Sequence, residues 1–140
     1  GSFAVPFAVV NDLLFLNSLS APARRAGIIE AIKVALIRDR LFFEEIERNA
    51  MQLRNLESDA LEMVIRKSAG LHVDHISTSG DPYELGSARP LDFGHWAAHK
   101  LEQITGFSLG HGEAVAVGMA VDLVYSKRIG LIWLNQISKI

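Results

Sequence analysis

Three of the chain's five histidines lie in one stretch, RPLDFGHWAAHKLEQITGFSLGHGEAVAVGM (residues 89–119). His95 and His99 are four residues apart, so a helix would place both on the same face. His111 stands between two glycines where a long apolar segment begins. The positive end of a helix at that point would favour a neutral imidazole, which is the form that binds metal. This stretch therefore predicts a candidate site for a divalent metal.

A carboxylate suited to the same metal is Glu30, in the apolar run AGIIEAIKVALI (residues 26–37). Burying an ionised carboxylate costs several kcal/mol unless a cation compensates its charge. A metal would compensate it, but so would Lys33 in a helical ion pair worth about 0.2–0.5 kcal/mol. The sequence leaves both interpretations open. With His95 and His111, Glu30 would complete a set of three protein ligands that leaves a position for water or substrate, as in catalytic zinc sites.

Two other histidine patterns are weaker signals. His95 and His99 could be paired ligands of a metallohydrolase, but the zinc-protease motif needs glutamate directly after the first histidine, and Trp96 stands there. The segment GLHVDHI (residues 70–76) contains two histidines and an aspartate. We expect it to form a solvated surface before a loop.

Composition narrows the class of protein. The 140 residues are 49% apolar and 21% charged, which is typical of a globular domain with a core. With no cysteine, any metal must be held by nitrogen and oxygen ligands. The net charge of −2 gives no reason to expect nucleic acid. No apolar run reaches the roughly 18 residues of a membrane span, and a basic signal-peptide start is absent. We therefore expect a cytoplasmic protein with neither a membrane nor a nucleic-acid partner.

Periodicity predicts an all-α domain with one short extended segment at its start. The apolar residues 7–10 follow a proline and favour that segment. Ser20, with a proline in the next turn, favours a helix start, and Gly106 favours a helix end. Residues 77–90, rich in glycine and proline, predict a loop. The expected helices cover residues 20–37, 41–49, 51–70, 94–105 and 112–128.

Four motifs occur in order along the chain: RAGIIEAIKVALIRD, DPYELGSARPLDFGH, HKLE and HGEAVAVGM. They resemble the C-terminal domain of 3-dehydroquinate synthase and its relatives, the sugar phosphate cyclases, over most of the chain. The resemblance implies that residues 1–140 form a helical metal- and substrate-binding domain that follows an N-terminal NAD-binding domain. It also implies the family's reaction, in which NAD oxidises a ring hydroxyl, phosphate is eliminated, the ketone is reduced again and an aldol addition closes a carbocycle.

By position, the resemblance implies roles for individual residues. The metal ligands, for zinc or cobalt, are Glu30, His95 and His111. The catalytic positions, one anchoring a substrate group and one moving protons or binding phosphate, are Lys33 and His99. The substrate-binding positions are Glu84, Arg89 and Asp92.

The chain also departs from the pattern of dehydroquinate synthases. Asp92 stands where they usually carry asparagine, Ala88 where they carry arginine (Arg89 is shifted by one), and Asp74 where they carry lysine. The missing cations help to hold the substrate's carboxylate, and a bidentate arginine is not replaced by a neighbour that points elsewhere. The departures favour a substrate without a carboxylate, and we hypothesise a heptulose phosphate, as used by valiolone-type synthases.

We therefore expect the metal-binding catalytic part of a phosphate-eliminating lyase, a fragment of a longer, homodimeric enzyme that turns over no substrate by itself. The alternative is a helical interaction module in which the histidines are core or cap residues and no metal binds.

Overall fold

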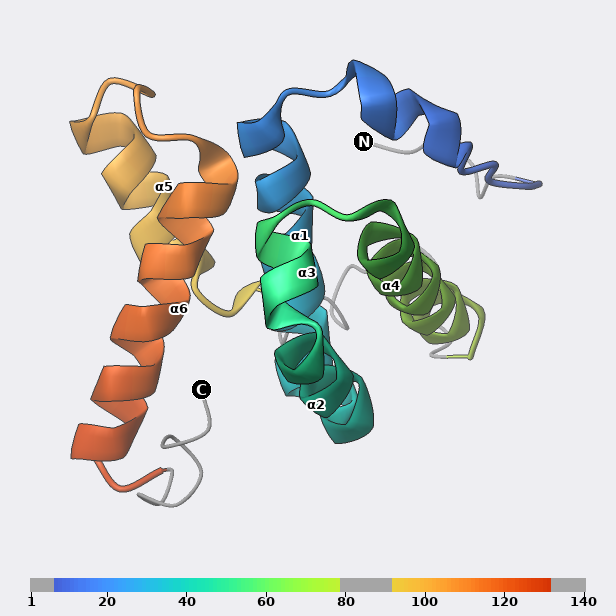
Figure 1. The fold of residues 1–140 in the computed structure, drawn as a ribbon. Helices are drawn as coiled ribbons and strands as arrows, with labels where there is room; N and C mark the ends of the chain where they lie inside the picture. The colour runs from blue at the N-terminus through green and yellow to red at the C-terminus, as the bar shows by residue number, and fades with distance from the viewer. Residues whose placement is uncertain (1–6, 79–91, 132–140) are drawn as a thin grey trace. The chain divides into compact units, whose positions relative to one another are not determined.

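The structure, a computed structural model, describes residues 7–78 and 92–131 of the chain. These residues are helical, with no β-strand in either range, which confirms the expected all-α class (Figure 1). They belong to two compact units, unit 1 (Gly1–Leu91) and unit 2 (Asp92–Ile140). In the part of the chain that is described, no helix has the length and apolarity needed to span a membrane.

Within residues 7–78, unit 1 contains a short 3-10 helix followed by four α-helices, shown in blue to green in Figure 1. Its core is a cluster of small and medium apolar side chains around Phe42, which is fully buried. The elements are η1 (Leu13–Ser18), α1 (Ala21–Arg38), α2 (Arg40–Arg48), α3 (Ala50–Arg54) and α4 (Ser58–Thr78).

Polar side chains at the helix starts explain where α1 and α2 begin. The Ser20 hydroxyl accepts the N–H of Ala23 at 3.4 Å, as the sequence predicted for α1. Asp39 separates the two helices because its backbone is extended, with φ −149° and ψ 100°. Its carboxylate accepts the N–H of Phe42 at 3.0 Å, which satisfies one of the free donors at the start of α2.

Replacing Asp39 with alanine should lower the free energy of unfolding by about 1 kcal/mol, because the N–H of the buried Phe42 loses its acceptor. Urea unfolding followed by circular dichroism measures the change. Asp74, exposed near the end of α4, provides the matched control. Its replacement with alanine should leave stability unchanged or slightly higher, since a negative charge there opposes the helix dipole. Equal losses for the two variants would contradict the capping role of Asp39.

Two expectations for unit 1 were wrong. Residues 7–12 form neither strand nor helix, because no described segment pairs with them, and the 3-10 helix η1 follows. The single helix expected over 51–70 is two helices, α3 and α4, separated by Leu56. The φ of Leu56 is +59°; its N–H donates to Leu53 and the N–H of Glu57 donates to Gln52, the pattern of a Schellman helix end. Leu56 packs on the core, which offsets the cost of that backbone conformation.

The end of α4 also differs from expectation. Ser77 and Thr78, predicted as loop, are its last residues, and their hydroxyls donate to the carbonyl of Asp74. The rest of the predicted loop, residues 79–90, lies outside the described residues.

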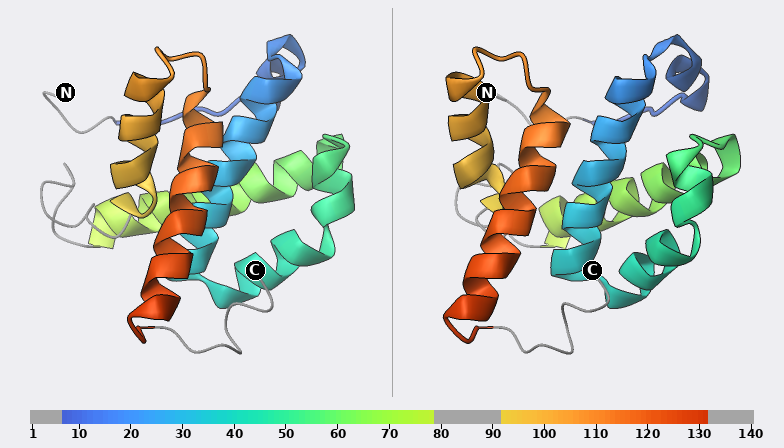
Figure 2. Two further views of the ribbon diagram at one scale, coloured as in Figure 1. Left: turned by 90° about the vertical axis from the view of Figure 1, so that its left-hand side faces the viewer. Right: turned by 60° about the vertical axis from the view of Figure 1, so that its left-hand side comes forward.

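The described residues of unit 2 form a pair of antiparallel helices, α5 (His95–Ile104) and α6 (His111–Arg128), which lie side by side in every view of Figures 1 and 2. The predicted stop at Gly106 is confirmed: its φ is +58°, and its N–H donates to Gln103. At the start of α6, the N–H of Gly110 donates to the carboxylate of Glu113 at 3.1 Å. Basic residues at the end of α6 suit the negative end of its dipole, as expected.

Candidate metal centre

A contact between two glycines fixes where α5 begins. Gly94 has a φ of +79°, and its N–H donates to the Oδ2 of Asp122 on α6 at 2.8 Å. A Cβ built on Gly118 would lie 1.9 Å from the carbonyl oxygen of Gly94, so the helices approach this closely only without a side chain there. The first residue of α5 is His95, and the position of His95 relative to α6 therefore depends on this contact.

The three histidines of unit 2 gather at one place on the helix pair. The ring centres are 5.5 Å apart for His95 and His99, 5.4 Å for His95 and His111, and 6.1 Å for His99 and His111. Two imidazoles that share one tetrahedral zinc have ring centres about 5 Å apart, given a Zn–N bond of about 2.0–2.1 Å. The cluster thus has the donor type and the spacing that a divalent metal requires. These distances alone do not separate His99 from the other two rings.

Hydrogen bonds do distinguish the rings. The Nδ1 of His111 lies 3.2 Å from the Oε1 of Glu102, and the Nδ1 of His95 lies 3.4 Å from the carbonyl oxygen of Phe93. Carboxylates and carbonyls only accept hydrogen bonds, so these contacts are hydrogen bonds when Nδ1 carries the proton, which leaves the lone pair on Nε2. Metal-binding histidines are held in this way by a partner outside the metal's own ligands. No acceptor of this kind is found for His99 within the described ranges.

Glu30 lies on α1, in unit 1, and forms the ion pair that the sequence left open. Its Oε2 is 2.6 Å from the Nζ of Lys33. The Lys33 side chain is only 6% exposed, so it depends on this carboxylate for a counter-charge, whereas Glu30 is 39% exposed. A carboxylate has about four lone-pair positions, and the ion pair is therefore compatible with a metal bond at the same group.

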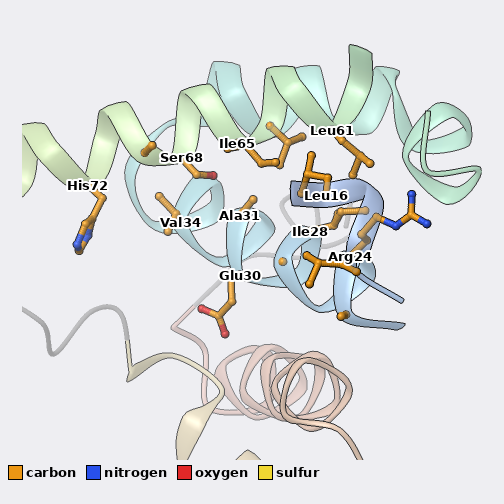
Figure 3. A pocket seen from close by; sticks show the side chains of 15 residues that line it. Leu16, Arg24, Ile28, Glu30, Ala31, Val34, Leu61, Ile65, Ser68 and His72 are labelled. Atoms are coloured by element: carbon orange, nitrogen blue, oxygen red, sulfur yellow. The ribbon is translucent and has the colours of Figure 1, made fainter. Parts of the chain in front are cut away.

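A pocket of about 400 Å³ opens beside Glu30, between α1 and α4 (Figure 3). Its wall is mostly aliphatic, with Ile28, Val34 and Ile65 among the lining residues. In Figure 3 the carboxylate of Glu30 and the imidazole of His72 both point away from this aliphatic wall. The polar side chains that line the pocket include Arg24 and Ser68.

The remaining residues singled out in the sequence fall into three groups. Asp92 is described and is exposed, immediately before α5. Glu84 and Arg89 lie outside the described residues. The histidines of the segment 70–76 are on α4, where one of them, His75, is 2.9 Å from the Nη2 of Arg38. That segment joins none of the groups of metal-binding side chains found among the described residues.

Glu102 was not singled out in the sequence, although it belongs to the site. His95, His99 and Glu102 follow the spacing i, i+4, i+7, which puts all three on one face of α5. One ligand-type atom from each of His99, Glu102 and His111 lies within 4.8 Å of the others. The spacing in HWAAHKLE was the available signal, but it does not show that His111 would return to the same face.

Comparison with known proteins gives a consistent result. Residues 27–140 match the family model described as 3-dehydroquinate synthase C-terminal. The chain is 39% identical over 130 residues to a 3-dehydroquinate synthase of Geobacillus thermodenitrificans, covering 92% of this chain and 35% of that protein. It is 35% identical over 133 residues to a 2-epi-valiolone synthase of Actinosynnema mirum, covering 94% of this chain and 34% of that protein. A bifunctional 3-dehydroquinate synthase/phosphatase of Fusobacterium nucleatum is 34% identical over 128 residues, and the match covers 90% of this chain and 19% of that protein.

No solved structure matches the chain. The chain spans about a third of the length of the first two relatives and about a fifth of the third. The family model covers most of the chain and names the C-terminal part of the family's proteins. The chain therefore belongs to the 3-dehydroquinate synthase family of sugar phosphate cyclases and corresponds to its C-terminal domain.

Proposed function

We propose that this chain is the metal- and substrate-binding part of a phosphate-eliminating cyclase, which converts a sugar phosphate into a carbocycle. The observation that carries the proposal is the cluster of His95, His99 and His111 at ring-centre distances of 5.4–6.1 Å in a chain of this family. A helical interaction module would not need three imidazoles within contact of one another beside a mostly buried carboxylate.

The proposed metal ligands are Glu30, His95 and His111, with zinc or cobalt as the ion. The hydrogen bonds at Nδ1 of both histidines support this choice, because they leave Nε2 to bind the metal. The nitrogen and oxygen donor set fits either ion. A divalent ion held there would lower the pKa of substrate hydroxyls and polarise a ketone.

The neighbouring side chains would handle the substrate. Lys33 would anchor an anionic or hydroxyl group of the sugar phosphate through its ammonium. His99, one turn along α5 from His95, would move protons or bind the phosphate. The other proposed substrate contacts are Glu84, Arg89 and Asp92. NAD would accept and return the hydride and would be bound by an N-terminal domain of the longer protein.

The proposed substrate is a heptulose phosphate, and the support comes from charge. Asp92 and Asp74 put carboxylates where dehydroquinate synthases usually carry asparagine and lysine, and negative groups disfavour a substrate carboxylate. The chain is about equally similar to a 3-dehydroquinate synthase and to a 2-epi-valiolone synthase. The choice between their substrates therefore depends on these residues.

The proposed partners, an NAD-binding domain and a second copy of the protein, are supported by apolar surface. Val117, Val121, Val124 and Tyr125 of α6 are all exposed, and their spacing places the three valines along one side of the helix. An apolar stripe of this kind is typical of a surface that contacts another protein or domain.

The experiment is an assay of the longer protein that contains this domain. With NAD and zinc, it should release inorganic phosphate from sedoheptulose 7-phosphate, and at least about tenfold less efficiently from the dehydroquinate precursor, since a lost charged contact costs at least about 1.4 kcal/mol. Chelation should stop the reaction. The 140-residue chain assayed by itself should be inactive. Efficient turnover of the dehydroquinate precursor would refute the substrate, and release of phosphate that does not depend on NAD or metal would refute the reaction.

A further inference from the structure

We infer that Glu102 is a positioning residue, which holds the imidazole of His111 in the tautomer that binds metal through Nε2. The inference rests on the proposed function in taking His111 as a ligand. Its basis is the 3.2 Å contact between the Oε1 of Glu102 and the Nδ1 of His111, which joins α5 to the first turn of α6. An ionised carboxylate can only accept this hydrogen bond, so the proton is on Nδ1.

Helix stability does not explain this carboxylate. Glu102 lies two residues before the end of α5, where a negative charge opposes the helix dipole. The start of α6 already has its own acidic side chain, Glu113, which accepts the N–H of Gly110. The Glu102 side chain is nevertheless only 16% exposed, and a carboxylate held mostly out of water needs a specific partner. His111 supplies that partner.

The partners at Nδ1 of His111 and His95 differ in kind. The Nδ1 of His95 faces the carbonyl oxygen of Phe93, a backbone group that no substitution removes. The Nδ1 of His111 faces a side-chain carboxylate instead, and an imidazole without such an acceptor at Nδ1 prefers the Nε2–H form. In that form Nε2 has no lone pair for a metal. The tautomer of His111 is therefore set by a side chain, and the tautomer of His95 by the backbone.

A role as a metal ligand fits Glu102 less well. The two ring nitrogens of an imidazole point in directions that diverge by far more than a right angle. A metal on Nε2 at about 2.1 Å would be roughly 7 Å from a carboxylate oxygen that accepts the Nδ1 proton. With a metal on Nε2, the carboxylate would be too far away to bond to the same ion, and its effect on the metal would pass through the ring.

The experiment compares the 140-residue chain with its Glu102→Gln and Glu102→Leu variants at about pH 8, which is above the usual pKa range of histidine. Long-range proton–nitrogen correlation spectra of the metal-free proteins report each tautomer. We expect His111 to be Nδ1–H in the parent chain, mixed in Glu102→Gln and mainly Nε2–H in Glu102→Leu, with His95 unchanged as the internal control. Zinc affinity, measured by competition with a chelating dye, should fall about 10- to 100-fold in Glu102→Leu and less in Glu102→Gln.

Circular dichroism checks that each variant folds. If Glu102→Leu does not fold, the comparison of the parent chain with Glu102→Gln still tests the inference. An Nε2–H tautomer of His111 in the parent chain would overturn the inference, as would weaker zinc binding without a change of tautomer. So would a loss in Glu102→Gln as complete as that in His111→Ala, since it would make Glu102 a ligand. Failure of the parent chain to bind zinc would count against the proposed function, while the tautomer of His111 would still decide the role of Glu102.

Discussion

Zinc binding by the chain should be lost when alanine replaces His111, with the affinity falling by more than about 100-fold. Removing an outer partner of a ligand costs about 10- to 100-fold, and removing the ligand itself must cost more. His95→Ala should have the same effect, because its Nε2 is the second proposed nitrogen donor. Isothermal titration calorimetry at neutral pH measures the affinity and the stoichiometry, which should be one zinc ion per chain in the parent protein.

Substitutions of Glu30 and His99 distinguish the proposed ligand set from one in which His95 and His99 are the paired ligands. Glu30→Gln should weaken zinc binding as strongly as His111→Ala does, while His99→Ala should change the affinity by less than about tenfold. Glu30→Gln keeps the size of the side chain but removes the counter-charge of the buried Lys33, so its fold must be checked by circular dichroism. His72→Ala, which removes an exposed imidazole on α4, is the matched control and should bind as the parent does.

The zinc affinities of these variants distinguish the proposed metal site from the two alternatives. If His99→Ala abolishes binding and Glu30→Gln does not, the paired-histidine metallohydrolase is correct and the proposed ligand set is wrong. If the parent chain binds no zinc, the helical interaction module is the better description of this chain.

Gly118→Ala should strongly destabilise unit 2. The new Cβ would lie 1.9 Å from the carbonyl oxygen and 2.8 Å from the carbonyl carbon of Gly94, and neither atom is a flexible side-chain end. This clash is relieved only if α5 moves away from α6. That movement breaks the hydrogen bond that the N–H of Gly94 donates to Asp122. Overpacking of this kind costs about 3 kcal/mol, well above the roughly 1 kcal/mol that alanine gains over glycine inside a helix.

Urea unfolding measures the stability, and the same preparation measures zinc affinity. We expect both to fall, because the displaced start of α5 carries His95 away from His111. Gly70→Ala is the matched control: Gly70 is also inside a helix, but a Cβ there would meet nothing within 4 Å. That variant should be more stable by about 1 kcal/mol. A Gly118→Ala protein as stable as Gly70→Ala would show that the close approach of the two helices is not required.

Local sequence signals predicted much of the fold. The Ser20 cap, the glycine stop at Gly106 and the basic end of α6 depend on side chains within one helical turn, and each was found where expected. The break at Leu56 was not predicted, because leucine rarely adopts a positive φ and the neighbouring signals, Asn55 and Ser58, are weaker than a glycine or proline. Leu56 adopts it in a structure where its side chain packs on the core cluster of unit 1, which is a contact between distant parts of the chain.

The sequence by itself determined the helical class, the family and the residue types available for chemistry, because periodicity, capping and ordered motifs are local properties. Only the tertiary structure decided that His111 meets His95 and His99 and that Glu102 holds His111. Those contacts join residues up to 16 positions apart, and they depend on an antiparallel turn and on a glycine at position 118 that lets α5 approach α6. The physical reason is that the packing of one helix on another is set by surface shape across both helices, which no single stretch of sequence contains.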